Sequence, residues 1–430
     1  MNFTIHGGKK LEGEITLSGA KNAATKMMIA SLLTDEPVML TNFPDIGDTA
    51  ITAELCRALG SIVELKENIL HIQTPKITNV HVTTLSRRNR IPVLALGPLL
   101  ARVGEAEVPM VGGDKIGARP VDLHIEGLEA LGAIIETTKD SYHATAPNGL
   151  RGAQIKLRFP SVGATENIIL GAVLAKGRTT ISNAAKEPEV IAFIKMLQQM
   201  GAIIELGANR MIYIDGVKKL HSATYEVPPD RNEAVSFACL AVATGGNVLV
   251  KGALQDHLIT FLNAIRRVGG EYKVEEKGIR FWRTNGLHAT EIETDTHPGF
   301  MTDWQQPYVV LLTQAQGSSV VHETIYEDRF GYINDLNAMG ADIAVFSKCL
   351  GELPCRFNGM GYNHSIIVNG PKKLHGVPLV VRDLRSGIAH IIAALVADGE
   401  SIISGIEEID RGYVTIETRL QALGAEIHRA

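Results

Sequence analysis

The pattern of hydrophobic and polar residues returns six times along the chain. Each copy consists of the end of an amphipathic helix, a glycine, and a short run in which apolar and polar residues alternate. A glycine after a helix is typical of a left-handed backbone conformation, which residues with a Cβ rarely adopt. The pattern therefore predicts six units of helix, turn and strand, with a period of about 70 residues. The glycines are Gly60, Gly132, Gly201, Gly269, Gly340 and Gly424.

A second helical pattern in these units ends before a run rich in β-branched residues, as in VLAKGRTTISNA and VATGGNVLVKGA. Such runs predict half-buried strands. Each unit is therefore mixed α and β, and it is too long for the common solenoid repeats. The last spacing, from Gly340 to Gly424, is longer than the others, and the surplus lies around GELPCRFNGMGYNH. We expect an extended hairpin or surface loop there, in the fifth unit.

Polar residues mark the predicted starts of these second helices. A side-chain oxygen at such a position accepts a hydrogen bond from the first helical turn. The candidates, each about 40 residues before its glycine, are Ser18, Ser161, Asp230, Asp303 and Asp383. The adjacent Pro228 and Pro229 predict a crossing point between two halves of three units each.

Composition narrows the class of protein. Of the 430 residues, 45% are hydrophobic and 21% are charged, as in folded globular proteins. The formal net charge of -5 excludes a broadly basic nucleic-acid binder, so any phosphate chemistry must use a local group of cations. No apolar run approaches the roughly 18 residues of a spanning helix. The N-terminal stretch lacks the apolar core of a signal peptide, and we expect a cytoplasmic protein.

The four cysteines are scattered, without a CxxC pair or a histidine at metal-ligand spacing. They are Cys56, Cys239, Cys349 and Cys355. This pattern favours reduced thiols in the core or in loops. We expect no metal and no cofactor.

The segment 110–124, MVGGDKIGARPVDLH, departs most from the repeat. Its glycines allow backbone freedom, while Lys115 and Arg119 add positive charge, which suits a lid that closes over an anionic substrate. It matches neither a P-loop nor a GxGxxG turn, so use of a nucleoside triphosphate or a dinucleotide is not supported. An ordinary solvated loop also fits these residues.

Further cations stand near predicted helix starts. Lys21 lies in a first helical turn, where a bound anion would offset its repulsion from the positive end of the helix dipole. Arginines in other units are Arg90, Arg231, Arg385 and Arg411. Because a guanidinium binds carboxylate or phosphate through two parallel hydrogen bonds, their convergence would create a site for a doubly anionic small molecule. Taken singly, each also fits a salt-bridged surface residue.

Several phrases of the chain are those of a known enzyme family. They are SGAKNAA at 18–24, ALGPLLARVG at 95–104, GARPVDLHIEGLEALGA at 117–133, PSVGATENI at 160–168, NAAKEPEV at 183–190, ETIYEDRF at 323–330, DLR at 383–385 and IDRGY at 409–413. Over residues 2–428 the chain resembles the enolpyruvyl transferases that act on UDP-N-acetylglucosamine. The resemblance implies an α/β fold, a two-domain inside-out α/β barrel of six βαβαββ repeats, three per domain. One domain would hold residues 1–20 and 229–430, and the other, 21–228, would include a mobile loop at 110–120.

The resemblance also implies the reaction. Phosphoenolpyruvate would donate its enolpyruvyl group to the 3-hydroxyl of UDP-N-acetylglucosamine by addition and elimination, with release of phosphate, as the first committed step of peptidoglycan synthesis. This chemistry needs anion clamps, a base for the hydroxyl and an acid for the methylene carbon. The implied partners are the two small-molecule substrates; no cofactor, nucleic acid, membrane or oligomer is implied.

Positions that match the family's motifs acquire roles by the same resemblance. Phosphate and carboxylate would be held by Lys21, Arg119 and Arg411, with Arg90 as a further clamp. Asn22 would lie near the sugar and the reacting centre, and Asp303 would face the 3-hydroxyl as its base. The uridine diphosphate would contact Pro120, Val121, Asp122, Leu123 and His124, and also Ser161, Val162 and Gly163. The remaining predicted substrate-side residues are Glu187, Arg231, Ile325, Arg329 and the pair Asp383 and Arg385.

One position departs from most of the family. The loop reads GGDKIGAR, so that Asp114 stands where most members carry Cys. A thiol is protonated at neutral pH and an exposed aspartic acid is not. Asp114 would act as proton donor only if closure of the loop desolvates it and raises its pKa. Fosfomycin alkylates the thiol at this position, so we expect it not to inactivate this protein.

Three alternatives stay open at this point. The 5-enolpyruvylshikimate-3-phosphate synthases share the repeat and the phosphoenolpyruvate chemistry, although RPVDLH and SVGATEN favour a uridine nucleotide. Some residues beside the predicted contacts depart from the family's pattern, which would fit a paralogue that uses another nucleotide. They include Thr25, Lys26, Trp304 and Gln305. A noncatalytic sugar-nucleotide binding protein would fit Asp114, but not the intact Lys21, Asn22, Asp303 and Arg411.

Overall fold

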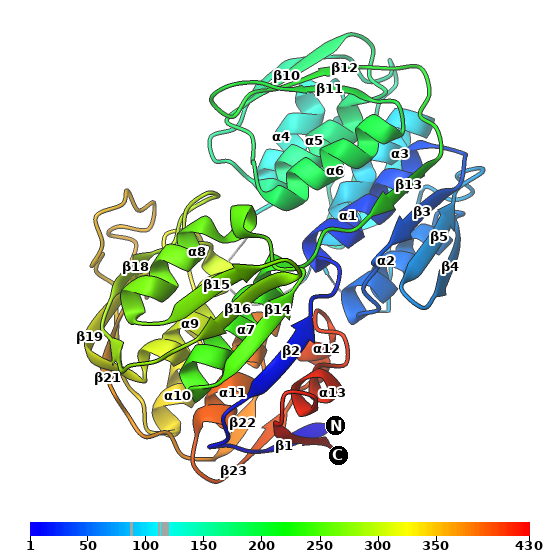
Figure 1. The fold of residues 1–430 in the computed structure, drawn as a ribbon. Coiled ribbons are helices and arrows are strands. Elements are labelled where there is room, and N and C mark those ends of the chain that lie inside the picture. Colours follow the sequence, from blue (N-terminus) through cyan, green and yellow to red (C-terminus); the bar gives the residue numbers. More distant parts are fainter. Residues whose placement is uncertain (87–88, 111, 113–119) are drawn as a thin grey trace. The chain divides into compact units, whose positions relative to one another are not determined.

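The computed structural model describes residues 1–86, 89–110, 112 and 120–430. The chain forms two compact units (Figure 1). Unit 1 consists of Met1–Ser18 and Pro229–Ala430, and unit 2 consists of the described residues between 19 and 228. Among the described helices, none combines the length and the apolar character needed to cross a membrane.

Unit 2 carries three small sheets. In two of them one strand pair is parallel and the other pairs are antiparallel. The third has only antiparallel strands, and a parallel bridge between His81 and Glu107 takes the place of a further strand. In strand order the sheets are β13 (Ala223–Glu226), β3 (Val38–Thr41), β5 (Ile69–Gln73) and β4 (Ile62–Lys66); β6 (Glu105–Pro109), β8 (Ser141–Thr145) and β7 (Ile134–Thr137); and β9 (Gln154–Lys156), β10 (Arg178–Ser182), β12 (Ile212–Asp215) and β11 (Ile203–Leu206).

Unit 1 repeats this plan with three more sheets. The beginning and the end of the chain meet in one of them, because β1 pairs with both β23 and β24 (Figure 1). In strand order the sheets are β22 (Pro378–Val380), β23 (Glu400–Ser404), β1 (Asn2–His6) and β24 (Glu426–Arg429); β2 (Glu12–Thr16), β14 (Asn247–Lys251), β16 (Gly278–Trp282) and β15 (Glu271–Glu275); and β17 (Leu287–His288), β19 (Ala315–His322), β21 (Ser365–Gly370) and β20 (Asp342–Phe346), with β18 (Glu291–Glu293) also on β19.

The inner helices of both units are buried over most of their surface. Every residue of α9 is buried, including Gln305 and Gln306 at its start. In unit 2 these helices are α1 (Lys21–Ala30), continued by η1 (Ser31–Leu33), then η2 (Ile91–Ala95) with α3 (Leu96–Val103), and α5 (Val162–Ala172). In unit 1 they are α7 (Arg231–Thr244), η3 (Thr302–Trp304) with α9 (Gln305–Leu312), and α11 (Leu384–Val396).

The outer helices are amphipathic and precede the repeated glycines. In α8, for example, Leu258, Leu262 and Ile265 are buried on one face. Each repeated glycine has a positive φ, between 92 and 111°, so the predicted six helix-glycine-strand turns are confirmed. These helices are α2 (Gly47–Ala58), α4 (Asp122–Ala130), α6 (Pro188–Gln199), α8 (Gln255–Val268), α10 (Ile333–Ala338) and α13 (Ile416–Gln421); a short α12 (Glu407–Asp410) lies before the last.

The surplus residues of the fifth repeat form the predicted extended hairpin. Strands β20 and β21 pair in antiparallel register, and the segment 347–364 connects them. This segment, which we call the β20–β21 segment, contains Cys349 and Cys355.

Three of the five predicted helix caps are confirmed. Ser161, Asp230 and Asp383 accept hydrogen bonds from the first turns of α5, α7 and α11. The other two predictions are wrong. Helix α1 begins after Ala20, and Ser18 instead uses its backbone, which donates to Glu233 and accepts from the Asp230 N–H. Asp303 lies inside the 3₁₀ turn η3, where tertiary contacts hold its carboxylate.

Candidate active site

Lys21 is the first residue of α1 in unit 2. The described first turn of this helix contains no acidic residue, and the preceding Ala20 contributes no side-chain cap. A cation at the positive end of a helix dipole is unfavourable by a few tenths to about 1 kcal/mol. Asp48, in the first turn of α2, offsets this cost by accepting a hydrogen bond from Nζ of Lys21 at 2.7 Å. The Lys21 side chain is 13% exposed, so it is mostly buried but still reaches the surface of the unit. The bond to Asp48 holds its ammonium group in one orientation.

His124 is held as a neutral donor at the start of α4. The Asn167 amide donates to its Nδ1 at 3.2 Å and to the Val93 carbonyl at 3.0 Å, which places the ring proton on Nε2. Burial, together with the smaller effect of the Arg90 charge, lowers the pKa of His124 to about 3. A Cβ on Gly163 would lie 2.9 Å from the imidazole ring, so a glycine is needed where α5 meets His124.

The starts of the inner helices in unit 2 favour anions. None of the described first turns of α1, η2, α3 and α5 contains an acidic residue. Orphan N–H groups and the helix dipole attract phosphate and carboxylate at such ends. Lys21 and Arg90 add cations there, and Ser161 caps α5 through a bond from the Ala164 N–H to its Oγ at 3.3 Å. The helix starts that carry Lys21 and Arg90 therefore have a local geometry suited to an anion, the kind of ligand that the sequence predicts for these two residues.

A buried acid in α5 was missed by the sequence analysis. Burial raises the pKa of Glu166 to about 8, and both carboxylate oxygens lack a hydrogen-bond partner among the described residues. The charge of Lys26 opposes this rise, while Glu187 and Glu189 reinforce it. Burial in turn lowers the pKa of Lys26. The available signal was a lone Glu within the apolar run ATENIILGA.

The positions of the other predicted substrate contacts in unit 2 do not test their predicted roles. Asn22 is half-buried in the first turn of α1, and Glu187 is buried at the N-cap of α6. Val121 is the N-cap of α4, and Asp122 forms an ion pair with Arg158. Pro120 is exposed, and Leu123, Val162 and Gly163 lie at the beginnings of α4 and α5.

Asp303 bridges two guanidinium groups in unit 1. Its Oδ1 accepts from Nη2 of Arg329 at 2.6 Å, and its Oδ2 accepts from Nε of Arg385 at 3.0 Å. Both arginines are buried. Burial works against their charged forms, but the Asp303 carboxylate together with other nearby acidic groups more than compensates, and the pKa of both arginines is raised. The structure therefore brings two residues of the fifth repeat, Asp303 and Arg329, and one of the sixth, Arg385, into one ion cluster.

The helix cap of α11 fixes one side of this cluster. Asp383 accepts from the backbone N–H of Arg385 at 3.0 Å. Arg385 also donates to the hydroxyl of Tyr413 at 3.4 Å. Burial raises the pKa of Tyr413 to about 12. Arg411, two residues earlier in the chain, donates to Glu408 at 2.6 Å and is 11% exposed.

The loop after β19 carries the predicted residues Ile325 and Arg329. Buried Glu323 organises this loop, because its carboxylate accepts from the backbone N–H groups of Ile325 and Tyr326 at 2.8 and 3.1 Å. The same carboxylate accepts from Thr302 at 2.9 Å, beside Asp303. Glu323 is a positioning residue that the sequence analysis did not find.

Arg231 is packed against an aromatic ring at the start of α7. Its guanidinium lies 5.5 Å from the ring centre of Trp304 and contacts His297 at 3.3 Å. Trp304 in turn donates from Nε1 to Asn232 at 3.0 Å. The substrate role of Arg231 stays a prediction. Asp114 and Arg119 lie outside the described residues, as does most of the predicted loop at 110–120.

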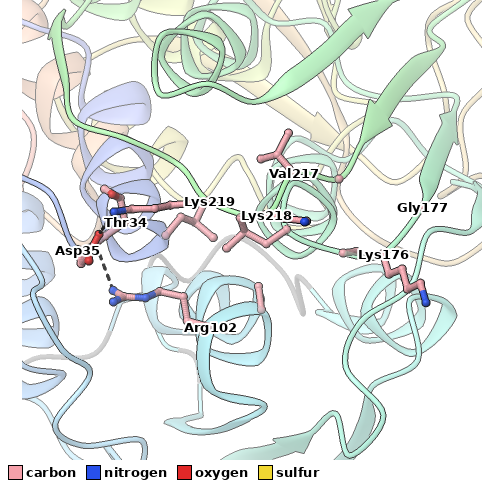
Figure 2. Close-up of a pocket in the computed structure, with 13 residues that line it drawn as sticks. Thr34, Asp35, Arg102, Lys176, Gly177, Val217, Lys218 and Lys219 are labelled. Atoms are coloured by element: carbon pink, nitrogen blue, oxygen red, sulfur yellow. Dashed lines mark hydrogen bonds and ion pairs between the residues drawn. The ribbon is translucent and has the colours of Figure 1, made fainter.

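A basic depression of unit 2 lies at the other ends of the inner helices. It has a volume of about 600 Å³ and is lined by the ends of η1 and α3 and by loop residues. Figure 2 labels Arg102, Lys176 and Lys219 among its lining residues. Arg102 donates there to the carbonyl groups of Leu32, Thr34 and Thr74, and Lys219 pairs with Asp35 at 3.1 Å. The last carbonyl groups of a helix have no partner within the helix, so they attract cations such as Arg102. None of the predicted site residues lines this depression.

The fold and the sequence together define a class of transferases. The family model described as EPSP synthase (3-phosphoshikimate 1-carboxyvinyltransferase) matches residues 5–420, so the chain belongs to this family of carboxyvinyltransferases. The solved enolpyruvyl transferase NikO from Streptomyces tendae has the same fold, with a TM-score of 0.85 and 23% identity over 99% of this chain and 98% of that chain. EPSP synthase from Acinetobacter baumannii matches with a TM-score of 0.74 and 20% identity, over the full length of both chains.

Curated relatives over nearly the whole length share one name, UDP-N-acetylglucosamine 1-carboxyvinyltransferase. The protein of that name from Chlamydia abortus is 48% identical, over 99% of this chain and 97% of its own. The Chlamydia pneumoniae protein is 47% identical, over 98% of this chain and 94% of its own. The Gluconobacter oxydans protein is 41% identical, over 99% of both chains.

Proposed function

We propose that this protein transfers the enolpyruvyl group of phosphoenolpyruvate to the 3-hydroxyl of UDP-N-acetylglucosamine and releases phosphate. The observation that carries the proposal is 48% sequence identity, over 99% of this chain, to a protein named for that activity. The Asp303 cluster and the helix starts without acidic residues support it. The reaction would belong to peptidoglycan synthesis. We place this reaction in the cytoplasm.

In unit 2 the anion-binding groups are assigned to phosphoenolpyruvate. Lys21 supplies a cation on an acid-free helix start, and Asp48 keeps its ammonium group in place. Arg90, at the N-cap of η2, adds a second cation. We assign Arg119 to the same task by its position in the sequence. Fixed donors of this kind stabilise the negative charge that moves to the phosphate oxygens as phosphate leaves.

The uridine diphosphate is assigned to the residues around His124. Its Nε2 carries a proton at neutral pH, so the ring can donate a hydrogen bond to a diphosphate oxygen without adding charge. Val162 and Gly163 at the start of α5, and Val121 and Asp122 before His124, offer backbone N–H groups for the same ligand. Ser161, Pro120 and Leu123 flank these groups and are assigned to the same ligand. We place Asn22 beside the sugar.

In unit 1 we assign Asp303 as the base. The 3-hydroxyl proton passes to a carboxylate oxygen of Asp303 as the hydroxyl oxygen bonds to C2 of phosphoenolpyruvate. An acid, which we assign to Asp114, gives a proton to C3 and completes a tetrahedral ketal. In the second step the Asp114 carboxylate takes a proton back from C3 and the double bond re-forms. Phosphate leaves with the proton that Asp303 accepted, so both aspartates regain their starting forms and atoms and charges balance.

The arginines and their supports keep the carboxylate of Asp303 in one orientation. Arg329 and Arg385 each hold one oxygen, and Asp383 fixes Arg385 through the start of α11. Arg411, whose side chain pairs with Glu408, is assigned to the substrate carboxylate. The further substrate-side assignments are Glu187, Arg231 and Ile325.

The experiment is a phosphate-release assay of the full chain with phosphoenolpyruvate and a series of acceptors. We expect release with UDP-N-acetylglucosamine and none above background with shikimate 3-phosphate or without acceptor. Faster phosphate release with another uridine nucleotide would show that this nucleotide is the acceptor and that the protein is a paralogue. Tight binding of UDP-N-acetylglucosamine without any phosphate release would contradict an enzymatic function.

A further inference from the structure

Four potential metal ligands converge beside the β20–β21 segment of unit 1. His322 ends β19, His364 precedes β21, and Cys349 and Cys355 belong to the segment itself. One ligand atom from each residue lies within 4.8 Å of all the others. Sγ of Cys349 is 3.2 Å from Nε2 of His364, and the two imidazole ring centres are 5.5 Å apart. The interpretation of these two cysteines as scattered thiols without a nearby histidine is therefore wrong.

Both histidines are oriented for ligation through Nε2. Nδ1 of His322 pairs with the Glu293 carboxylate at 2.9 Å, and Nδ1 of His364 lies 2.6 Å from the Tyr362 carbonyl oxygen. Carboxylates and carbonyl groups hold metal-binding histidines in this way. The His322 ring is fully buried, and its Nε2 has no hydrogen-bond partner among the described residues. A buried nitrogen without a partner is unfavourable, and a metal ion would satisfy it.

The segment is folded closely around the Glu293–His322 pair. A Cβ on Gly351 would overlap with Oε2 of Glu293 and with Nδ1 of His322, so only glycine fits there. The backbone N–H groups of Glu352 and Leu353 donate to the Glu293 carboxylate at 2.8 and 2.9 Å. The carboxylate that orients His322 is therefore held by the segment's own backbone.

The cysteine side of the cluster is enclosed as well. The backbone N–H of Phe357 donates to Sγ of Cys355 at 3.4 Å. The Phe357 ring is buried, with its centre 6.3 Å from that of His364. An N–H donor beside a sulfur atom stabilises a thiolate, and the aromatic ring limits the access of water.

We propose that His322, Cys349, Cys355 and His364 form a structural Cys₂His₂ zinc site. Zinc–sulfur bonds of about 2.3 Å and zinc–nitrogen bonds of about 2.0 to 2.1 Å in a tetrahedron separate the ligand atoms by about 3.3 to 3.8 Å, which a small contraction of the cluster achieves. Two thiols lose their protons on binding, and the two thiolates balance the charge of Zn²⁺. Four protein ligands leave no open position for catalysis.

The site would attach the β20–β21 segment to the sheet of the fifth repeat. Much of the segment is exposed, and the described apolar anchor within it is Phe357. Zinc would link the segment to the end of β19 and to the start of β21. Arg356 donates to the Ile325 carbonyl, so the same attachment supports the loop that carries Ile325 and Arg329.

Metal content of the full chain tests the proposal. The protein is purified without a metal-affinity step, equilibrated with Zn²⁺ alone under reducing conditions, desalted, and measured by elemental mass spectrometry. We expect about one zinc per chain in the wild type and in Cys56→Ala, a control cysteine in the core of unit 2. Cys349→Ser and Cys355→Ser should each lose at least about nine-tenths of it. A zinc-free wild type, or full zinc in both serine variants, would overturn the proposal.

Limited trypsin digestion gives a second readout on the same samples. The β20–β21 segment contains the potential cleavage sites Lys348 and Arg356. We expect a chelator to accelerate cleavage after these residues by at least tenfold in the wild type and to have no effect on either serine variant. A chelator-insensitive wild type, or a disulfide between Cys349 and Cys355 in the reduced protein, would also contradict the site. Metal content and cleavage are independent of the transferase assay, so either proposal can fail alone.

Discussion

The Nε atom of Arg385 donates a hydrogen bond to Oδ2 of Asp303 at 3.0 Å. Arg385 is fixed at the same time by its backbone N–H, which donates to Asp383 at the N-cap of α11. The orientation of the proposed base therefore depends on where a helix from another repeat begins. Such coupling of a carboxylate to a rigid element is how a fold holds catalytic geometry.

Asp303→Asn should remove the base while it keeps the shape of the side chain. We expect kcat to fall by about 10² to 10⁴, the usual contribution of a positioned base, with a smaller change in KM. The control is Asp342→Asn, which removes an exposed ion pair with Lys372 in the same unit. Steady-state kinetics well below the unfolding temperature measure both variants. Wild-type kcat in the Asp303→Asn variant would remove Asp303 from the chemistry.

Lys21→Met tests the assignment of phosphate binding to α1. We expect kcat/KM for phosphoenolpyruvate to fall by at least about 100-fold, because a charge-assisted contact that is stronger in the transition state is lost. The same substitution removes the cation that pairs with the Asp48 carboxylate, and so lowers stability. Lys219→Met, which breaks an exposed pair, is the matched control.

The double variant Lys21→Met with Asp48→Asn separates the two effects. Neutralising residue 48 should restore much of the lost free energy of unfolding, because the buried carboxylate that faced Lys21 is gone. It should not restore kcat/KM, because the cation for the substrate is still absent. Recovery of activity in the double variant would show that Lys21 only neutralises Asp48.

Asp114 can be tested although it lies outside the described residues. Asp114→Asn should lose most of the activity and the limb of the pH–rate profile that reports the acid. Asp114→Cys should gain time-dependent inactivation by fosfomycin, whereas the wild type should show none. Full activity of Asp114→Asn would remove this residue from the mechanism, and stoichiometric inactivation of the wild type would contradict its alignment.

Because His124 is buried in its neutral form, we expect the free energy of unfolding to decrease in acid. Its folded-state pKa, about 3, lies below the usual value of 6.5, so its contribution is complete above pH 6.5 and is lost as the pH falls towards 3. At pH 5 the loss amounts to about 2 kcal/mol of the free energy of unfolding. Denaturant unfolding at pH 7 and pH 5 measures it, with His124→Gln for comparison. The Gln variant should show a smaller difference between the two pH values; an equal difference would contradict the prediction.

The sequence predicted the parts of the fold that local rules determine. Gly60 and Gly424 have the positive φ that a helix end followed by a strand requires, and so do the other repeated glycines. Asp230 and Asp383 cap their helices because a short polar side chain reaches the first-turn N–H groups of its own segment. These features depend on a few neighbouring residues.

The missed features depend on residues far apart in the chain. Asp303 has the sequence context of a cap, but Arg329 and Arg385 provide stronger, charged partners and a 3₁₀ turn lengthens the helix entry. Glu166 acquires its raised pKa only because the surrounding helices exclude water. Cys349 and His322 meet because β19 and β20 both lie beside β21, a pairing that no local spacing reveals.

The most direct measurement is the structure of the product. The full chain is incubated with UDP-N-acetylglucosamine and phosphoenolpyruvate labelled with ¹³C at C2, and the nucleotide product is isolated and examined by NMR. We expect one new ether in which the labelled carbon couples through oxygen to the proton at C3 of the sugar, with one phosphate released for each product molecule. A label attached at any other position, or an unchanged sugar nucleotide after prolonged incubation, would contradict the central claim.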